Sequence, residues 1–288
     1  MQWYDKCFAS LRKSTIPVQT IVVDNTSGSE DAEYIKTHYP EIHIIKTEEN
    51  LGFGRANNLG MRYALDNGCD YVFLLNQDTW LEQPNAIELL VQIAESHPDF
   101  GILSPMHLSA DCKKVDMNFE NTNHTCSQNL VSDLYCRTLQ DIYPTDYINA
   151  AAWLLPRKTL ETVGGFDPIF KHYEEDDNYL NRVLYHKLKV GLCPSALIVH
   201  DHPNTDVIIP LSEIRKKQFL LVEWTDINKS FSVGRYLRYY VRKLLVNVIC
   251  ANWNQTKRYA RHIKYLLELH KPVRDSRNTN MKQQSSWL

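Results

Sequence analysis

The stretch YVFLLNQDT, residues 71–79, joins an apolar run to a short polar turn that carries one carboxylate. An apolar run of this length, bounded by turn residues, predicts a buried strand. In open α/β sheets, ligands bind just beyond the carboxyl ends of the strands. Asp78 is therefore expected where a small molecule would bind, although an Asp in this position is also an ordinary turn residue.

Strand and helix patterns alternate on both sides of this run. Apolar or β-branched stretches predict strands at residues 20–24, 42–46, 100–104, 148–155, 188–194 and 196–200. Amphipathic spacing and capping residues predict helices at residues 29–37, 53–67, 84–97, 158–163 and 175–185. Between residues 105 and 146 the rhythm breaks into a polar, Asn-rich segment. The alternation predicts an α/β fold with a mostly parallel sheet flanked by helices.

The start of the chain departs from this rhythm. A doubly wound sheet normally opens with a buried strand, whereas residues 5–13 have a helix-like pattern. We therefore expect the first strand to be missing, either because the protein lacks it or because the sequence starts after it.

Charge divides the chain near residue 204. Residues 1–204 hold 16 Lys and Arg against 28 Asp and Glu, a balance of −12. Residues 205–288 hold 16 against 6, a balance of +10, and the two sum to the net charge of −2. We expect an α/β domain at residues 1–203 and a basic helical appendage at residues 204–288.

The basic tail contains a helical pattern with two distinct faces. One face is basic and holds Arg235, Arg238 and Arg242. The opposite face is apolar and holds Leu237, Tyr240, Val241, Leu244 and Leu245. This pattern suits an interfacial helix on an anionic membrane surface, and it suits equally a helix packed on the acidic domain. The acidic body and the absence of a known module argue against nucleic acid as a partner.

The composition excludes several classes of protein. No apolar run reaches the roughly 18 residues of a membrane span, and the N-terminus lacks the pattern of a secretory signal. Seven scattered cysteines without a C-x-x-C pair fit reduced thiols in a cytosol and argue against a cysteine metal site. We expect a cytoplasmic protein, at most peripheral at the inner face of the membrane.

Two segments place polar groups after predicted strands. Asp24 closes the first predicted strand, where its carboxylate could accept hydrogen bonds from a base or from ribose, or could simply cap a turn. The segment NLGFGRANN, residues 50–58, sets two glycines beside Arg55 at a predicted helix start, which suits contact with a phosphate or a sugar nucleotide. An ordinary turn is the alternative, because the spacing matches neither a dinucleotide-binding motif nor a P-loop.

Four consecutive acids, residues 174–177, open the last predicted helix. Like charges this close raise some of the pKa values, whereas the helix dipole and any metal lower them. One of these acids could serve as a general base, and simple capping of the helix is the alternative. Farther on, His200 and His202 follow a strand-like run. A His and a carboxylate from different strand ends could share a divalent cation, although a lone His is more often structural.

Five motifs thus follow one another in a fixed order. They are VVDN (22–25), NLGF (50–53), LLNQDT (74–79), GGFD (164–167) and EDD (175–177). In this order and spacing the chain resembles the family 2 glycosyltransferases, and within them the rhamnosyltransferase-like members. The resemblance covers residues 1 to about 203, and the tail lies outside it.

The resemblance implies a GT-A fold and an inverting transfer of a sugar from a nucleotide diphosphate sugar to a hydroxyl of a glycan or lipid-linked acceptor. Rhamnosyl transfer in surface polysaccharide synthesis is one such reaction. The resemblance further implies a divalent cation, Mn²⁺ or Mg²⁺, bound by Asp78 and His200. It makes Asp176, or its neighbour Glu175, the catalytic base. The donor-binding residues implied are Asp24, Asn25, Asn50, Gly52, Arg55, Asn57 and Asn76.

The chain departs from the family pattern in two places. Asn76 stands where the family has the first acid of its metal-binding D-x-D element, which weakens the expected metal affinity. The missing first strand normally helps to hold the nucleotide. Both departures favour the alternative of a non-catalytic sugar-nucleotide-binding or scaffold protein on a degenerate transferase fold. A nucleotidyltransferase is a further rival, but it would need a Gly-rich basic loop near the N-terminus, which this chain lacks.

Overall fold

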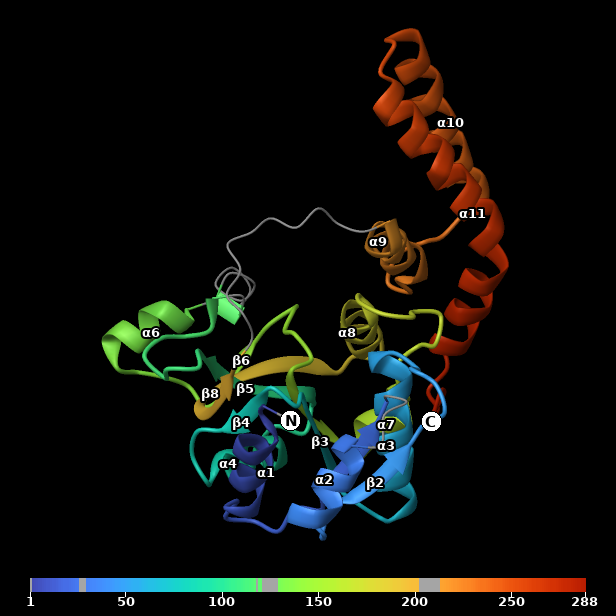
Figure 1. The fold of residues 1–288 in the computed structure, drawn as a ribbon. Helices are drawn as coiled ribbons and strands as arrows, with labels where there is room; N and C mark the ends of the chain where they lie inside the picture. The colour runs from blue at the N-terminus through green and yellow to red at the C-terminus, as the bar shows by residue number, and fades with distance from the viewer. Residues whose placement is uncertain (1, 26–29, 118, 121–128, 202–212) are drawn as a thin grey trace.

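The computed structural model describes residues 2–25, 30–117, 119–120, 129–201 and 213–288 (Figure 1). Its helices are α1 (Tyr4–Arg12), α2 (Glu30–His38), α3 (Phe53–Asp66), α4 (Ala86–Ser96), α6 (Leu130–Cys136), α7 (Arg157–Val163), α8 (Glu175–Tyr185), α9 (Glu213–Thr225), α10 (Val233–Ile249) and α11 (Trp253–Asn280). Its strands are β1 (Ile21–Asp24), β2 (His43–Lys46), β3 (Tyr71–Leu75), β4 (Thr79–Leu81), β5 (Phe100–Leu108), β6 (Tyr143–Pro144), β7 (Ala152–Pro156) and β8 (Lys189–His200).

The main sheet has the strand order β3-β7-β5-β8-β4, with β6 paired to β8, and β1 and β2 form a separate parallel pair. The predicted α/β class is confirmed, but the predicted mostly parallel sheet is wrong. In the main sheet only β5 and β8 pair in parallel, among the described residues, and the other pairings are antiparallel. The long connection from β5 brings the chain back at the same end of the sheet. Strand β7 therefore runs opposite to both of its neighbours.

Most predicted elements are confirmed to within a few residues. Helix α1 occupies the helix-like start of the chain, and β3 and α8 have the predicted bounds. The two strands predicted on either side of Ser195 are one long strand, β8, with an irregularity where its register against β5 shifts after Cys193. The short elements β4, α6 and β6 were not predicted. The predicted helix start at residue 29, the predicted site residue His202 and the boundary predicted after residue 203 fall outside the described residues.

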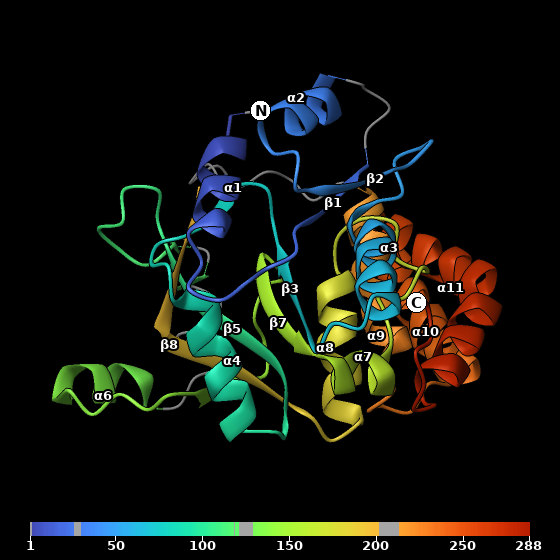
Figure 2. The same ribbon diagram turned by 90° about the horizontal axis from the view of Figure 1, so that it is seen from below.

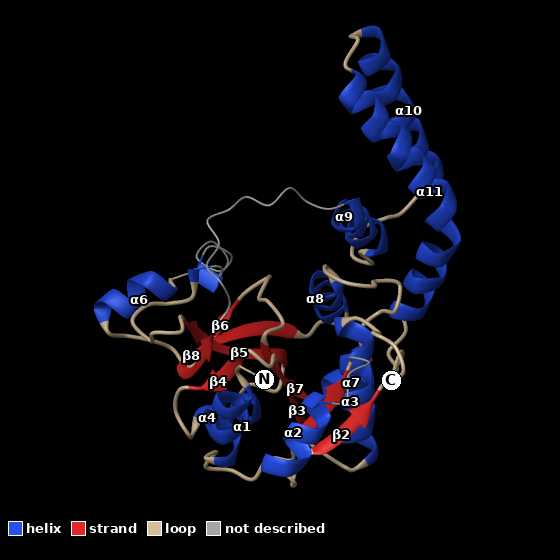
Figure 3. Ribbon diagram, in the orientation of Figure 1, coloured by secondary structure: helices blue, strands red, loops and turns tan. Residues whose placement is uncertain are grey.

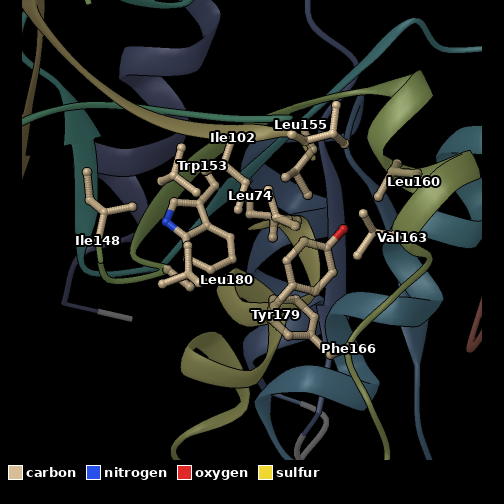
Figure 4. Close-up of a cluster of buried hydrophobic side chains, with 14 of the residues drawn as sticks. Leu74, Ile102, Ile148, Trp153, Leu155, Leu160, Val163, Phe166, Tyr179 and Leu180 are labelled. Carbon is tan, nitrogen blue, oxygen red and sulfur yellow. The ribbon is translucent and has the colours of Figure 1, made fainter. Parts of the chain in front are cut away.

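The core lies on both faces of the main sheet because successive strand residues point to opposite sides. Trp153 and Leu155 of β7 pack with Phe166 and Tyr179 on the face covered by α7 and α8 (Figure 4). Leu154, between them, packs with residues of α4 on the other face (Figure 2). Each such fully buried large side chain contributes about 1.5–3 kcal/mol. This packing fixes the ends of β3, β7 and β8 relative to the start of α8.

The expected C-terminal helical region is confirmed (Figure 3). Helix α9 lies against α8, and α10 and α11 pair as a hairpin that extends away from the sheet. Their shared core contains Leu221, Trp224, Tyr240, Leu266 and Val273, together with Phe170 from the α/β part. No helix among the described residues combines the length and apolarity needed to cross a membrane.

Candidate active site

A cleft of about 1140 Å³ gathers the predicted metal and base residues. Asn76 and Asp78 reach it from the turn after β3, and His200 reaches it from the end of β8. The acids at the start of α8 line it together with Tyr147 and with Arg215 of α9. The cleft thus lies beyond the carboxyl ends of two strands, where ligands bind in open α/β sheets.

Asp78 and His200 are brought together by the pairing of β4 with β8. Thr79 stands opposite His200 in this antiparallel ladder, and the backbone N–H of Asp201 donates to the carbonyl of Asp78 at 2.9 Å. The side chains meet with Asp78 Oδ1 3.7 Å from His200 Nε2. Both are largely buried, with 22% and 9% of the side chain exposed. The register of the β4–β8 ladder therefore determines that Asp78 and His200 meet. No local pattern in the sequence predicts this contact.

These two side chains fit a divalent cation as part of its ligand set. A carboxylate oxygen and an imidazole nitrogen are both ligands that Mn²⁺ accepts, and they face each other across a gap that one cation could fill. The described residues contain no group of three or more His, Cys, Asp or Glu able to hold a metal ion.

The acid cluster is held in an unusual backbone conformation. Tyr173 and Glu174 both have positive φ, 70° and 68°, a region that costs energy for residues other than glycine. Glu174 is buried and lies 3.3 Å, Oε1 to Nε, from Arg215. This ion pair ties the start of α8 to α9. Strain of this kind persists only where the surrounding contacts enforce it, and it gathers at functional sites.

Burial makes the acids of this cluster hard to ionise. It raises the pKa of Glu175 to about 7, and the neighbouring charges of Asp176 and Glu174 add to the effect. It raises the pKa of Asp177 to about 7 in the same way, and it also raises that of Asp176. Backbone N–H groups oppose the rise at Asp176, which accepts from the N–H of Asp177 at 3.0 Å. Asp176 is thus an acid poised to take up a proton.

Glu175 is the most enclosed acid of the cluster. Its side chain is 4% exposed, and its Oε2 has no hydrogen-bond partner among the described residues. A buried carboxylate oxygen without a donor favours the protonated form. Glu175 therefore differs from Asp176, whose oxygen accepts a backbone hydrogen bond.

A second cavity of about 530 Å³ adjoins the cleft, because His172 lines both. Its other polar residues are Glu49, Asn50, Arg55 and Lys171. Gly52 lies here with φ +80°, and a Cβ at this position would collide with the carbonyl of Lys171. The glycine thus lets the 50–58 segment approach Lys171 closely. Two cations in one cavity suit an anionic ligand.

Some residues that the resemblance assigns to binding of the sugar donor make hydrogen bonds within the protein. Asn25 accepts from the N–H of Leu51 at 2.7 Å and donates to Asn50 Oδ1 at 3.2 Å, so it links the end of β1 to the loop before α3. Asn57 donates to the carbonyl of Phe53 in its own helix at 3.0 Å. Among the described residues, those that line the two cavities do not include Asp24, Asn25 or Asn57. Their donor-binding roles stay predictions.

Sequence reasoning missed several residues of this site. Tyr147, Lys171, His172 and Arg215 line the cavities but belong to no motif that could have marked them. Asn58 had a signal, since it closes the NLGFGRANN segment. It is buried and bonds to both backbone groups of Phe166, at 2.8 Å to the carbonyl and 2.7 Å from the N–H. Asn58 thereby joins the 50–58 segment to the GGFD segment, 108 residues away.

Comparison with known proteins finds a family match for the first part of the chain. Residues 2–128 match the model of glycosyl transferase family 2. These residues form a family 2 glycosyltransferase domain. The resemblance seen in the motifs is confirmed, including the likeness to rhamnosyltransferases described next.

Three curated relatives resemble this chain at modest identity. The low-salt glycan biosynthesis hexosyltransferase Agl10 of Haloferax volcanii is 25% identical over 187 residues, which are 64% of this chain and 59% of the relative. The O-antigen chain rhamnosyltransferase WbaN of Salmonella anatum is 22% identical over 209 residues, 71% and 63% of the two chains. The N-acetylglucosaminyl-diphospho-decaprenol L-rhamnosyltransferase of Mycobacterium tuberculosis is 25% identical over 234 residues, 73% and 75%. The chain thus spans about three fifths of the length of the first two.

The structure of GalNAc-T7 with UDP, GalNAc and Mn²⁺ has a similar fold. It superposes with a TM-score of 0.52 at 14% identity and covers 75% of this chain and 44% of its own. At this identity the likeness concerns the fold alone. It confirms the expected GT-A-type architecture of this chain.

Proposed function

We propose that this protein is an inverting glycosyltransferase. It transfers a sugar from a nucleotide diphosphate sugar to a hydroxyl group of a glycan or lipid-linked acceptor. The observation that carries the proposal is a single cleft lined both by an Asp–His pair at the ends of two strands and by a cluster of acids at the start of α8. The family 2 match of residues 2–128 supports this assignment.

The donor belongs to the side of the cleft formed by β3 and β8. Asp78 and His200 would hold Mn²⁺ or Mg²⁺, which when bound neutralises charge that develops on the nucleoside diphosphate leaving group. Arg55 and Lys171 in the adjoining cavity would attract the phosphates. Asn50, Gly52 and Asn76 would shape the donor pocket. Asp24, Asn25 and Asn57 would support the nucleoside side.

The acceptor belongs to the side formed by the start of α8. Asp176 takes the proton from the acceptor hydroxyl as its oxygen attacks the anomeric carbon from the face opposite the leaving group. A single displacement of this kind inverts the configuration and needs no protein nucleophile. Arg215 offsets the charge of Glu174, so the cluster carries less negative charge when Asp176 ionises. Glu175 is the second candidate for the base.

The relatives point to the class of sugar and acceptor. Two are named as rhamnosyltransferases, and one of these acts on N-acetylglucosaminyl-diphospho-decaprenol, a lipid-linked molecule. For this chain we infer hexosyl or rhamnosyl transfer in surface polysaccharide synthesis. We place the reaction in the cytoplasm, at the inner face of a membrane that holds a lipid-linked acceptor.

Product analysis with a panel of nucleotide diphosphate sugars, with and without Mn²⁺, tests the proposal. A glycosyltransferase releases a nucleoside diphosphate from at least one donor, faster with Mn²⁺. A nucleotidyltransferase releases pyrophosphate, and a scaffold binds a donor without releasing either product. Binding without release, across the panel and with lipid-linked acceptors present, would overturn the proposal in favour of the scaffold.

A further inference from the structure

The free end of the α10–α11 hairpin is apolar and exposed. Five large apolar side chains lie exposed within residues 245–253: Leu245, Val246, Val248, Ile249 and Trp253. Ile249 is 84% exposed and Trp253 is 61% exposed. Single exposed apolar residues are common, but such a group at one end of an element marks an interaction site. We call residues 245–258 the hairpin tip.

The tip shares only Leu245 with the apolar face that the sequence pattern favoured for lipid. Leu237 and Tyr240 were expected on a lipid-facing stripe, but they pack in the core shared by α9, α10 and α11. Tyr240 is 4% exposed. The inner part of the apolar stripe of α10 therefore packs within the helical region, whereas Val241 and Leu245 of the same stripe are exposed. Most of the exposed apolar surface of the hairpin lies at the end that extends away from the sheet (Figure 1).

The charged side chains in the outer part of the hairpin, residues 233–267, are all Lys or Arg. Residues 227–267 contain no Asp or Glu, and residues 233–267 contain eight Lys and Arg. Lys257 and Arg258 belong to the tip itself and are exposed, and Lys243 precedes it closely. Each basic residue near an anionic membrane strengthens binding by about fivefold. An apolar end surrounded by cations complements a surface of anionic headgroups over acyl chains.

The base of the hairpin is joined to the wall of the cleft. Arg277 of α11 donates to the carbonyl of Asp226 at 2.5 Å and to that of Trp224 at 3.1 Å. Asp226 and Lys229, in the connection between α9 and α10, line the cleft. A surface bound at the tip would thus be coupled through one rigid pair of helices to the acceptor side of the cleft.

We propose that the hairpin tip binds an anionic lipid surface, end-on. Ile249 and Trp253 enter the boundary between headgroups and acyl chains, where Trp is favoured, and Lys257 and Arg258 contact the headgroups. The tip does not span the bilayer. This inference names the surface on which the proposed transferase works, and in that sense it rests on the proposed function, although lipid binding can be measured without turnover.

Cosedimentation of the full chain with vesicles tests the proposal. Vesicles of phosphatidylcholine with phosphatidylglycerol should bind the protein at least about tenfold more tightly than phosphatidylcholine alone, and added salt should weaken this binding. The double change Ile249→Asp and Trp253→Asp should lower the affinity by about tenfold or more. The matched control is Val131→Asp with Tyr135→Asp, because these exposed apolar residues lie on α6, and this variant should bind as the unchanged protein does.

A fluorescent label locates the contact independently of any loss of binding. Cys250 lies in the tip and Cys136 lies on α6, and both are exposed. A polarity-sensitive dye would be attached to two variants, one that keeps Cys250 and lacks Cys136 and one that keeps Cys136 and lacks Cys250. In both variants Cys69, Cys112 and Cys126 are changed to Ser. Anionic vesicles should shift the emission of the dye at Cys250 to the blue and leave that at Cys136 unchanged.

The possible outcomes distinguish lipid binding by the tip from the proposed transferase activity. Equal binding of the tip variant and the unchanged protein, a blue shift at Cys136 instead of Cys250, or no sedimentation with anionic vesicles would each overturn the proposal. Self-association without lipid, seen by light scattering and lost in the tip variant, would assign the tip to a second copy instead. Release of nucleoside diphosphate from a donor without vesicles should be the same in the tip variant. If neither the tip variant nor the unchanged protein released nucleoside diphosphate from any donor, the proposed function would be contradicted, and the result on lipid binding would still stand.

Discussion

Two parts of the cleft lining differ: the side formed by β3 and β8 holds Asp78 and His200, which meet at the end of a β-ladder, and the side formed by α8 holds four acids crowded into the start of that helix. The first side brings a carboxylate within 3.7 Å of an imidazole nitrogen, and backbone pairing fixes both. The second side brings like charges together on a strained backbone, and one ion pair with Arg215 helps to hold them. The first is thus built to keep one arrangement, whereas the second is sensitive to the gain and loss of protons. That division suits a donor that must be held and an acceptor that must be deprotonated.

The largest effect is expected at the proton-sensitive side. Asp176→Asn keeps the shape of the side chain and removes its basicity, so turnover should fall by roughly a hundredfold or more. Donor affinity, measured by calorimetry, should change little. Asp177→Asn is the matched control and should retain most of the turnover. Near-normal turnover of Asp176→Asn would show that Asp176 is not the base. In that case Glu175→Gln should be inactive, and if it too were active, the cluster would not supply the base.

The next effect is expected at the fixed side. Asp78→Ala removes a charged ligand, so the gain in donor affinity that Mn²⁺ provides should fall by about tenfold or more. The control is Asp201→Ala on the same ladder, whose carboxylate instead accepts from Trp3 Nε1 at 3.0 Å. It should keep the effect of Mn²⁺. Calorimetric titration of the donor with and without the ion decides between these outcomes, and an unchanged gain in Asp78→Ala would show that the cation is bound elsewhere.

A third prediction concerns stability and pH. Burial raises the pKa of Glu175 from 4.5 to about 7, so the folded state binds a proton that the unfolded state has released within this window. The contribution of Glu175 to the free energy of unfolding is fully present below pH 4.5 and is lost as pH rises through about 7, by up to about 3 kcal/mol. Glu175→Gln cannot ionise and should flatten this part of the stability curve. Urea unfolding at several pH values measures it, and an equally steep decline in Glu175→Gln would refute the assignment.

The smallest effect is expected at the loop that borders the donor cavity. Asn25→Ala removes the acceptor of the Leu51 N–H and the donor to Asn50, so the free energy of unfolding should fall by about 1–2 kcal/mol. Donor affinity should fall a few fold because the loop loosens. Asn57→Ala removes only a bond to the carbonyl of its own helix and should change stability by less. Thermal unfolding compares the two, and a larger loss in Asn57→Ala would contradict this account.

Much of the fold was predictable because it depends on local patterns. The run at β3 and the acid-capped start of α8 carry their own signals, and both elements have the predicted bounds. The direction of β7 was not predictable, because it depends on which end of the sheet the chain returns to after a long irregular segment. Alternating strands and helices suggested parallel pairing, because a helix between two strands usually returns the chain to the opposite end of the sheet. The long segment before β7 instead returns the chain to the same end.

The site shows the same division. Asp78, His200 and the α8 acids were found from motifs and strand ends, and the structure brings them to one cleft. Arg215 was missed because its partner Glu174 is 41 residues away and no pattern links them. Lys171 enters its cavity only because Gly52 allows a close approach of two backbones. Contacts of this kind arise from packing between distant segments, and a single sequence records them only as unremarkable charged residues.

The far end of α11 has a consequence for how the protein forms during synthesis. Ser276 and Asn280 donate to Asp167 at 2.5 and 2.7 Å, and the carbonyl of Ser286 accepts from the N–H of Gly165 at 2.8 Å. Asp167 leaves the ribosome 109 residues before Ser276, which at about 5–20 residues per second is a delay of roughly 5–20 s. During that interval the buried carboxylate lacks these donors. The segment that carries α7 and α8 therefore completes its packing only after most of the chain has been translated, and a slowed ribosome prolongs the exposure of that surface to chaperones and proteases.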